Sequence, residues 1–489
     1  MRHLIVVDSI EAWAERLPNV QTLAARDYLG GSEWSSLRSA RVYNLCRSYR
    51  YQATGYYVSL LAAARGHRPL PSVATMQDLK SPNVIRLMSS ELQQLTQRSL
   101  KPIQSDSFVL SIYFGRNLAE RHQGLSRALF KLFPVPLLRA EFARSENEWL
   151  LRRLGPIAIG EVPESHLDFM RESARRFFSG ERPRTAQSKK TRYDLAMLVN
   201  PAEAHPPSNE KALQRFERAG AELGFYVERI GPDDIGRLAE FDALFIRETT
   251  AVNHHTFRFA RKAAAEGLVV IDDPDSILKC TNKVYLAELL ARHNVPAPKT
   301  MLVHRENIDE IEARIGLPAV LKQPDSAFSI GVVKVKDSAE LRSTVRQLLK
   351  SSELIVAQEY LPTAFDWRVG IVDGRPLYVC RYHMARGHWQ IIKHDLDKGM
   401  DEGNVDTLAI GEAPDLVIRT ALKAASLIGD GLYGVDLKES DGKVRVIEVN
   451  DNPSIDGGIE DEVLKGALYR EILGVMLKRI EARKRGDPG

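Results

Sequence analysis

Two side chains near the C-terminus have the types and the spacing of metal ligands. Glu448 and Asn450 lie in residues 444–450 (VRVIEVN), an apolar stretch that predicts a strand. Because side chains alternate along a strand, Glu448 and Asn450 should share one face, while Ile447 and Val449 should point to the other face and be buried. Carboxylate and amide oxygens are ligands that hard cations such as Mg²⁺ accept.

A third oxygen ligand, Asp436, lies in the preceding strand-like stretch, and Asp441-Gly442 signals a hairpin turn between the two strands. A two-residue turn would pair Asp436 with Ile447 and place it on the wrong face. A three-residue loop over 441–443 would pair it with Glu448, and this is the register we predict. Two opposed carboxylates repel each other unless a cation lies between them. The set therefore predicts a Mg²⁺ site, and an ordinary acidic surface hairpin is the alternative.

Two lysines upstream have positions that suit a phosphate chain. Lys283 stands at the start of a helix with an apolar stripe, and Lys322 ends a strand that enters a loop of small residues. An ammonium group is a compact charge, and loop amides can reach phosphate oxygens. The loop is not a Walker A motif, which requires GxxxxGK[ST]. The alternative for each lysine is a solvated surface position.

Residues 354–361 (LIVAQEYL) form a buried strand that runs into a polar hinge, and a strand that begins at Asp366 follows. Hinge N–H and C=O groups can read an adenine edge, and a carboxylate such as Asp366 can accept both ribose hydroxyls. Taken alone, the stretch is a sheet element without a ligand.

Alternating strands and helices must position these groups. Residues 179–190 are polar, contain Gly and Pro, and predict a linker. Before it, strands at 4–7 and 107–113 and helices at 166–178 and 54–65, the latter closed by Gly66, indicate an α/β region. After it, regular alternation predicts a parallel α/β unit. Its strands are expected at 193–199, 225–229, 241–247 and 268–271, and its helices at 209–223, 254–266 and 276–292. A second α+β region runs from Lys299 onward.

The composition bounds the class of protein. A length of 489 residues suggests about three domains, and 44% hydrophobic with 27% charged residues suits a large core. No run approaches the roughly 18 apolar residues of a membrane span, and three scattered cysteines fit a reducing compartment. We therefore expect a cytoplasmic protein. Residues 1–190 carry 28 Lys and Arg against 17 Asp and Glu, so this part could attract an acidic partner or simply present solvated arginines.

In order and spacing, these motifs resemble the ATP-grasp superfamily, and most closely its RimK-like ligases. The matching elements are Lys283, Lys322, residues 358–361 (QEYL), 366–368 (DWR), 434–436 (GVD) and 448–453 (EVNDNP). Residues 40–51 (ARVYNLCRSYRY) resemble the domain that precedes ATP-grasp modules in long RimK-like proteins. The resemblance implies an α/β ATP-grasp fold, in which a pre-ATP-grasp domain and two α+β subdomains clamp ATP, behind an extra N-terminal α/β domain. The implied boundaries are 1–180, a linker at 181–192, 193–300, and 301–489 divided at 362/363.

The resemblance also implies residue roles. Arg247, Arg368 and Arg381 would act near the substrate and the transferred phosphate. Mg²⁺ or Mn²⁺ would be held by Asp436, Glu448 and Asn450. ATP would be bound by Lys283, Lys322, Ser326, Ser329, Gly331, Gln358, Glu359, Tyr360, Leu361 and Asp366. The family loop after the second lysine is usually glycine-rich, and here Ser326 and Ser329 replace two glycines. We expect a stiffer phosphate loop that still acts as a lid. Arg386 and His388 are expected at the substrate end.

The implied reaction joins a carboxylate to an amine through an acyl phosphate, with ATP consumed. Glutamate is the family's usual amine, the acceptor could be a metabolite, a peptide or a protein tail, and family members are often homo-oligomers. A regulator that binds ATP without turnover is one alternative. A nucleic-acid or acidic-protein binding module in residues 1–180 is another, because residues 47–51 (RSYRY) mix arginine with aromatic side chains. We expect the isolated histidines, including His254 and His255, to be structural or solvated.

Overall fold

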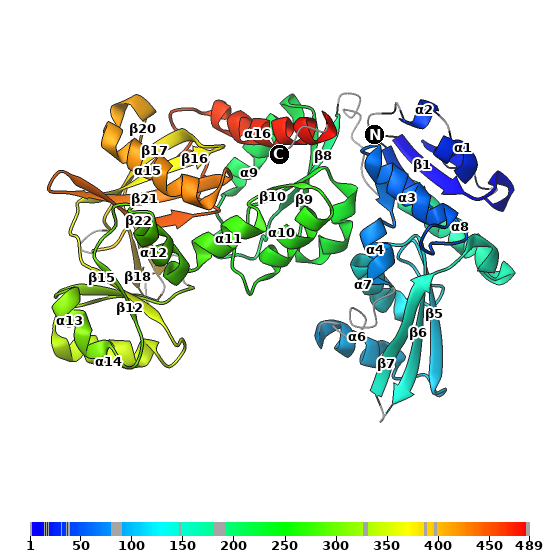
Figure 1. Cartoon of the computed structure of the whole chain (residues 1–489), viewed down its shortest axis with the longest axis horizontal. Helices are drawn as coiled ribbons and strands as arrows, with labels where there is room; N and C mark the ends of the chain where they lie inside the picture. The colour runs from blue at the N-terminus through cyan, green and yellow to red at the C-terminus, as the bar shows by residue number, and fades with distance from the viewer. Residues whose placement is uncertain are drawn as a thin grey trace. The chain divides into compact units, whose positions relative to one another are not determined.

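The structure is a computed structural model of the 489-residue chain. It describes residues 2–13, 15, 17, 19–30, 32–35, 37, 40–79, 90–145, 148–179, 191–325, 331–385, 389–395 and 399–485. The chain divides into two compact units. The first holds Met1–Arg192 and Asp233–Glu240, and the second holds Tyr193–Pro232 and Phe241–Gly489. Most of the predicted linker lies outside the described residues. Figure 1 shows the helices and strands of each unit.

The first unit opens with a four-stranded parallel sheet in the order β2-β1-β3-β4. Its strands are β1 (Arg2–Val7), β2 (Val20–Ala24), β3 (Ala40–Asn44) and β4 (Arg68–Leu70). β1 and β3 are the central strands, and nearly all of their residues are buried, as expected when both faces of a parallel sheet are covered. α3 (Thr54–Ala64) is followed by Gly66 at φ +69°, which confirms the predicted helix stop.

A second sheet of the first unit is antiparallel, in the order β5-β6-β7. It consists of β5 (Ser107–Tyr113), β6 (Leu137–Ser145) and β7 (Glu148–Pro156). Apolar residues of α6 (Ser90–Leu100) and α7 (Gln123–Leu132) share one buried core with this sheet. α8 (Glu164–Ser179) contributes Met170 and Ala174 to a neighbouring core. The strand expected at 107–113 and the helix expected at 166–178 are confirmed.

The arginine–tyrosine segment of the first unit is partly structural. Tyr49 is buried, and its hydroxyl donates to the carbonyl of Asn44 at 2.6 Å. Tyr51 is exposed and its ring lies 5.1 Å from that of Tyr56. Only part of the segment that suggested a nucleic-acid surface is therefore available to a partner.

The second unit begins with a parallel sheet in the order β11-β10-β8-β9. Asn209 caps the helix after the first strand, because its side chain accepts from the amide of Ala212. The strands are β8 (Tyr193–Leu198), β9 (Phe225–Ile230), β10 (Ala243–Ile246) and β11 (Val269–Ile271), and the helices are α9 (Glu210–Glu222) and α10 (His255–Ala265). The predicted parallel α/β unit is confirmed.

The single helix expected at 276–292 is wrong, because the chain forms two helices there. α11 (Pro274–Thr281) and α12 (Lys283–Arg292) are separated by Asn282, which has φ −103° and ψ +108°. The side chain of Asn282 accepts from the amides of Val284 and Tyr285. This cap begins a new helix and places Lys283 at its first position.

Two larger antiparallel sheets follow in the second unit, and β18 (Ile392–Asp395) and β19 (Gly399–Glu402) form a two-stranded antiparallel sheet. The first has the order β12-β15-β13-β14, with β12 (Thr300–Val303), β13 (Ala319–Lys322), β14 (Val332–Val335) and β15 (Ile355–Glu359). The other has the order β20-β17-β16-β21-β22, with β16 (Phe365–Val372), β17 (Arg375–His383), β20 (Val405–Leu408), β21 (Leu432–Ser440) and β22 (Lys443–Asn450). α15 (Asp415–Ile428) packs on this sheet, and α16 (Gly466–Arg485) packs against α9 (Figure 1).

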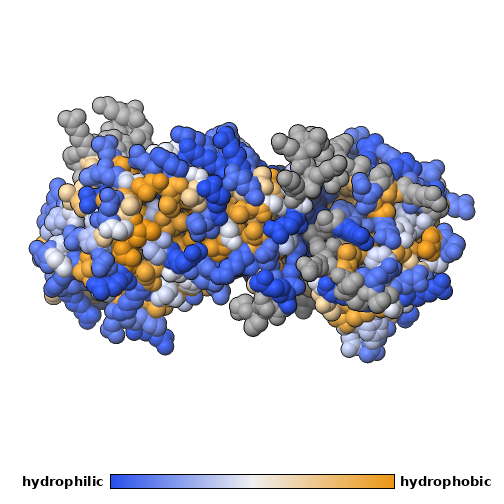
Figure 2. Space-filling view, turned by 90° about the horizontal axis from the view of Figure 1, so that it is seen from above, coloured by the Kyte–Doolittle hydropathy of each residue, from blue (hydrophilic) through white to orange (hydrophobic). Residues whose placement is uncertain are grey.

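Hydrophilic side chains dominate the face drawn in Figure 2, with apolar patches between them. Scattered exposed apolar residues are normal on a protein surface. Across the described part of the chain, no helix has the length and apolar character needed to cross a membrane.

Candidate functional site

One cavity of about 640 Å³ in the second unit collects most of the predicted site residues. Both antiparallel sheets line it, together with loops at the ends of β8 and β10. The predicted residues in its wall are Lys283, Lys322, Gln358, Glu359, Tyr360, Leu361, Asp366, Arg368, Asp436, Glu448 and Asn450. They are spread over residues 283–450 in sequence, so the fold rather than local sequence brings them together.

Asp436 pairs directly with Glu448 across β21 and β22, which is the register that the sequence predicted. The predicted reason is wrong, because the turn holds two residues and not three. Asp441 and Gly442 have φ +53° and +69°, as a type I′ turn requires. A β-bulge next to Asp436 supplies the missing residue.

The bulge also changes the environment of Ile447. The sequence predicted that Ile447 and Val449 would be buried on the face opposite to Glu448. Val449 is fully buried, but Ile447 is the unpaired residue of the bulge and lines the cavity. A bulge re-aims side chains locally, which simple alternation cannot anticipate.

Each of the three predicted metal ligands has a polar partner in the cavity wall. Arg368 binds Asp436 with two parallel bonds, Nε to Oδ1 at 2.6 Å and Nη2 to Oδ2 at 2.8 Å. Lys283 Nζ lies 2.8 Å from Glu448 Oε1. Asn450 donates its amide to Asp436 Oδ2 at 3.1 Å. Burial alone would raise the pKa of Glu448, but Lys283 and Lys322 outweigh it and lower that pKa, so the carboxylate is charged.

The two predicted phosphate-binding lysines approach each other through their loops. Lys283 is the first residue of α12, and its amide donates to the carbonyl of Pro324 at 2.9 Å. Asn282 donates to Asp325 Oδ1 at 2.9 Å, so the start of α12 is joined to the loop after Lys322. Burial lowers the pKa of Lys322 to about 8, since an ammonium loses its hydration there, and Lys283 acts in the same direction.

Lys438 is a site residue that the sequence analysis missed. Its Nζ lies 2.5 Å from Asp366 Oδ1 and 2.7 Å from Thr363 Oγ1. Burial raises the pKa of Asp366, and Lys438 opposes that shift. The signal was present, because Lys438 follows Asp436 by two residues and therefore shares its face of the strand.

The hinge after β15 is held by β12. The amide of Glu359 donates to the carbonyl of Lys299 at 2.9 Å, and Glu359 Oε1 accepts from the amide of Lys299 at 3.0 Å. Gln358 donates to Thr300 Oγ1 at 3.1 Å. Beyond these contacts the chain at Tyr360 and Leu361 reaches the cavity wall. The predicted adenine-binding hinge therefore lies at the cavity, as its role requires.

Two of the three arginines predicted to act on substrate do not line the cavity. The guanidinium of Arg381 lies over the rings of Phe365 and Trp367, at 5.2 and 4.8 Å, on the face of the sheet opposite to Arg368. Arg247 is 1% exposed and donates to Ser208, Asn452 and Pro453. These positions are at odds with direct contact to a cavity ligand, and Arg247 instead fixes the loops around it.

Gly331 is the described part of the predicted phosphate loop. It has φ +74°, and a Cβ there would lie 2.5 Å from Gln323 Oε1. Its carbonyl accepts from the amide of Gln323 at 2.9 Å. A side chain larger than hydrogen would strain the backbone and collide with Gln323. Ser326, Ser329, Arg386 and His388 lie outside the described residues, so the expectations for them stay predictions.

Two family models match long stretches of the chain. The family described as "RimK-like ATP-grasp domain" matches residues 280–466, and the family described as "RimK-like ATPgrasp N-terminal domain" matches residues 25–173. The fold is therefore that of an ATP-grasp protein. Residues 280–466 are identified as a RimK-like ATP-grasp domain, and residues 25–173 as the N-terminal domain that accompanies such modules.

Individual relatives are distant. The "Probable alpha-L-glutamate ligase 1" of Pseudoalteromonas atlantica is 25% identical over 251 residues, which are 50% of this chain and 78% of the relative. A "Probable alpha-L-glutamate ligase" of Pseudomonas fluorescens is 25% identical over 255 residues, 51% of this chain and 79% of the relative. The D-alanine–D-alanine ligase structure from Bacillus anthracis has 17% identity and a TM-score of 0.47, and covers 61% of this chain and 100% of its own.

Proposed function

We propose that the protein is an ATP-dependent ligase that joins a carboxylate to an amine through an acyl phosphate, with release of ADP and phosphate. One observation carries the proposal. Lys283, Lys322, Asp436, Glu448 and Asn450 converge on a single cavity, with the hinge and Asp366 in the same wall. Cationic side chains that could bind a phosphate chain and oxygen atoms that could bind a metal therefore line the same cavity. The names of the distant relatives, which are glutamate ligases, support the same chemistry.

The chemistry of the donor set fits Mg²⁺. Asp436 and Glu448 face each other on neighbouring strands, and Asn450 bonds to Asp436 on the same face. Both carboxylates are already paired with cationic side chains, so the site is built to hold positive charge beside them. We propose that these three residues hold Mg²⁺, which would neutralise charge on the phosphates.

The chain's own residues would orient the nucleotide. Lys283 and Lys322 would bind phosphate oxygens, backbone groups from Glu359 to Leu361 would bind adenine, and Asp366 would accept the ribose hydroxyls. Lys438 holds Asp366 and thereby fixes the direction of its free oxygen. Phosphoryl transfer asks for little covalent chemistry from the protein, because positioning and charge neutralisation supply most of the catalysis.

The reaction then balances in two steps. A substrate carboxylate oxygen attacks the γ-phosphorus of ATP, and the bond to the bridging oxygen breaks to leave ADP. The amine nitrogen attacks the acyl carbon next, phosphate leaves with the bonding electron pair, and the amine loses a proton. Arg368 is the arginine whose side chain lines the cavity, so it is our candidate for contact with the transferred phosphate.

Acidic side chains in one part of the cavity wall suit an amine. Asp456 and Glu460 line this part, beside Asn209. Asp456 accepts from the amide of Asn209 at 2.6 Å, and Glu460 accepts from the amide of Asp456 at 2.6 Å. We propose an amino acid as the amine substrate, and glutamate, named in the relatives, is the first to test. The acceptor carboxylate belongs to a metabolite, a peptide or a protein tail.

The test is ADP release by the purified full-length protein with ATP, Mg²⁺ and pools of amino acids and carboxylates. We expect ADP formation that depends on an added amino acid and disappears in the double variant Asp436→Asn/Glu448→Gln. Asp441→Asn is the matched control, because Asp441 is an exposed acid in the turn of the same hairpin and asparagine tolerates its positive φ. ATP binding without turnover in every pool would overturn the ligase in favour of an ATP-binding regulator.

A further inference from the structure

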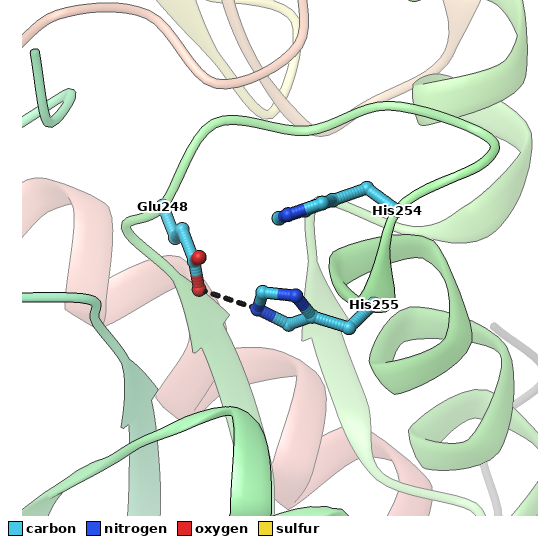
Figure 3. Close-up of side chains that lie close together, drawn as sticks. All are labelled: Glu248, His254 and His255. Atoms are coloured by element: carbon cyan, nitrogen blue, oxygen red, sulfur yellow. Dashed lines mark hydrogen bonds and ion pairs between the residues drawn. The ribbon is translucent and has the colours of Figure 1, made fainter. Parts of the chain in front are cut away.

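A second group of potential metal ligands lies at the loop that joins β10 to α10. Glu248 comes just after β10, and His254 and His255 stand at the start of α10. One ligand atom from each of the three lies within 4.8 Å of the others. Figure 3 shows both imidazole rings reaching from the helix end toward the carboxylate of Glu248. Among the described residues, no other three His, Cys, Asp or Glu side chains come this close.

The carboxylate of this group is buried and oriented. Glu248 is 1% exposed, and its Oε1 accepts from Asn200 Nδ2 at 3.0 Å. Its other oxygen, Oε2, lies 2.8 Å from His255 Nε2. A buried carboxylate needs polar partners. Carboxylates that bind metals typically accept a hydrogen bond from a neighbouring group that does not itself bind the metal, as Glu248 does from the Asn200 amide.

The hydrogen bond between Glu248 and His255 does not account for the second histidine, His254. The rings of His254 and His255 have centroids 3.9 Å apart. Two imidazolium ions at that distance would repel each other strongly. An imidazole nitrogen that carries no proton offers a lone pair to a metal ion. His254 Nδ1 is 3.1 Å from Thr256 Oγ1, which fixes the ring's orientation.

We propose that Glu248, His254 and His255 bind a divalent transition-metal ion of the Zn²⁺ class, with water as the fourth ligand. Two imidazoles and one carboxylate are a ligand set that Zn²⁺ accepts in tetrahedral geometry. The site differs from the all-oxygen set at Asp436, Glu448 and Asn450, which suits Mg²⁺.

To bind the ion, the three ligand atoms would need to move only slightly closer together. Bonds of about 2.0–2.1 Å in a tetrahedral site place ligand atoms roughly 3.4 Å apart, whereas these atoms lie within 4.8 Å of one another. Side-chain rotation at the edge of the loop can supply that difference. A metal ion bound at His255 Nε2 would take the place of the hydrogen bond to Glu248 Oε2, with the ring proton on Nδ1.

An ion at this position would stabilise the loop at 249–253. Glu248 and His254 stand at the two ends of the loop at 249–253, and the ion would tie these ends together. Thr249, Thr250 and Asn253 of this loop line the main cavity. The ion would therefore fix one wall of that cavity without touching its ligands.

The test uses the full-length protein after chelator treatment and dialysis, loaded with Zn²⁺ or Co²⁺ and then desalted. We expect one retained metal per chain by elemental analysis, and Co²⁺ absorption bands typical of a tetrahedral nitrogen–oxygen site. Glu248→Gln, His254→Gln and His255→Gln should each weaken binding roughly tenfold or more. The thermal midpoint of wild type should rise with Zn²⁺, because the ion binds the folded form.

Two controls keep the result specific. His293→Gln removes an exposed histidine in another part of the same unit and should retain the metal. Asp436→Asn/Glu448→Gln disables the proposed Mg²⁺ site and should also retain it. Circular dichroism of the metal-free variants checks that they fold. His254→Gln should be the mildest of the three, because His254 bonds to Thr256 and not to the buried Glu248. Metal uptake that is absent from wild type, or unchanged in all three ligand variants, would overturn the proposal.

Discussion

Raising the pH from 7 to 9 should weaken ATP binding about tenfold, because Lys322 loses its proton in that interval. Lys322 is 8% exposed, and its pKa is about 8. If the phosphates bind the ammonium form, affinity follows the protonated fraction of the free protein. That fraction is roughly 90% at pH 7 and roughly 10% at pH 9. A tenfold loss of affinity corresponds to about 1.4 kcal/mol.

The sign of the effect follows from burial. The pKa of Lys322 lies below its ordinary value of 10.5, so keeping the buried charge costs about 3 kcal/mol. Between pH 8 and 10.5 the unfolded chain binds more protons at this lysine than the folded protein does. The contribution of Lys322 to stability therefore rises with pH across that window. A loss of ATP affinity between pH 7 and 9 would report the lost charge and not unfolding caused by this residue.

The assay is calorimetric titration with a non-hydrolysable ATP analogue and Mg²⁺ at pH 7, 8 and 9. Phosphate groups titrate near pH 6, below this range. Lys322→Arg should bind with almost no pH dependence, because a guanidinium stays charged throughout. Lys350→Arg, an exchange at an exposed lysine, should keep the wild-type slope. The reasoning is refuted if wild-type affinity is constant over the range, or if Lys322→Arg retains the same slope.

Two further substitutions test the packing of the second unit. Arg368→Lys should lower the urea midpoint and reduce kcat/KM, because a lysine cannot form the two parallel bonds of 2.6 and 2.8 Å to Asp436. The free energy of unfolding should fall by about 1.5–3 kcal/mol. An unchanged midpoint would mean that this ion pair adds nothing to stability. Gly474→Ala in α16 should raise the free energy of unfolding by about 0.5–1 kcal/mol, and with it the thermal midpoint, because the added Cβ meets no atom within 4 Å. A lower midpoint would contradict the packing at this position.

Much of the fold could be predicted because its signals are local. The strands of the parallel sheets are short apolar runs, and Gly66 and Asn209 mark helix ends by the chemistry of their own residues. Asn282 was missed although its type fits an N-cap, because the apolar period continues across it. A side chain that caps a new helix competes with continuation of the preceding helix, and the sequence does not show whether one helix or two will form.

Site residues could be predicted where alternation along a single strand decides which side chains share a face. They could not be predicted where contacts between distant segments decide the position of the side chain. Alternation placed Glu448 and Asn450 correctly and would have placed Lys438 as well. The side of the sheet taken by Arg381 depends on the register of β16 against β17, which places it over Trp367. Arg247 is buried by loops that begin more than 200 residues later, at Asn452, and no local pattern encodes that contact.

The ion pairs of the cavity couple the two halves of the proposed site. Lys283 is a proposed phosphate ligand, and its partner Glu448 is a proposed metal ligand. If Lys283 turns to a phosphate, Glu448 loses its nearest positive charge and its affinity for a cation rises. A cation bound at Glu448 in turn releases Lys283 for the nucleotide. Because such coupling is reciprocal, each ligand should strengthen the other by the same factor. The pairing of an acid on β22 with a lysine on α12 thus favours joint binding of metal and nucleotide over either alone.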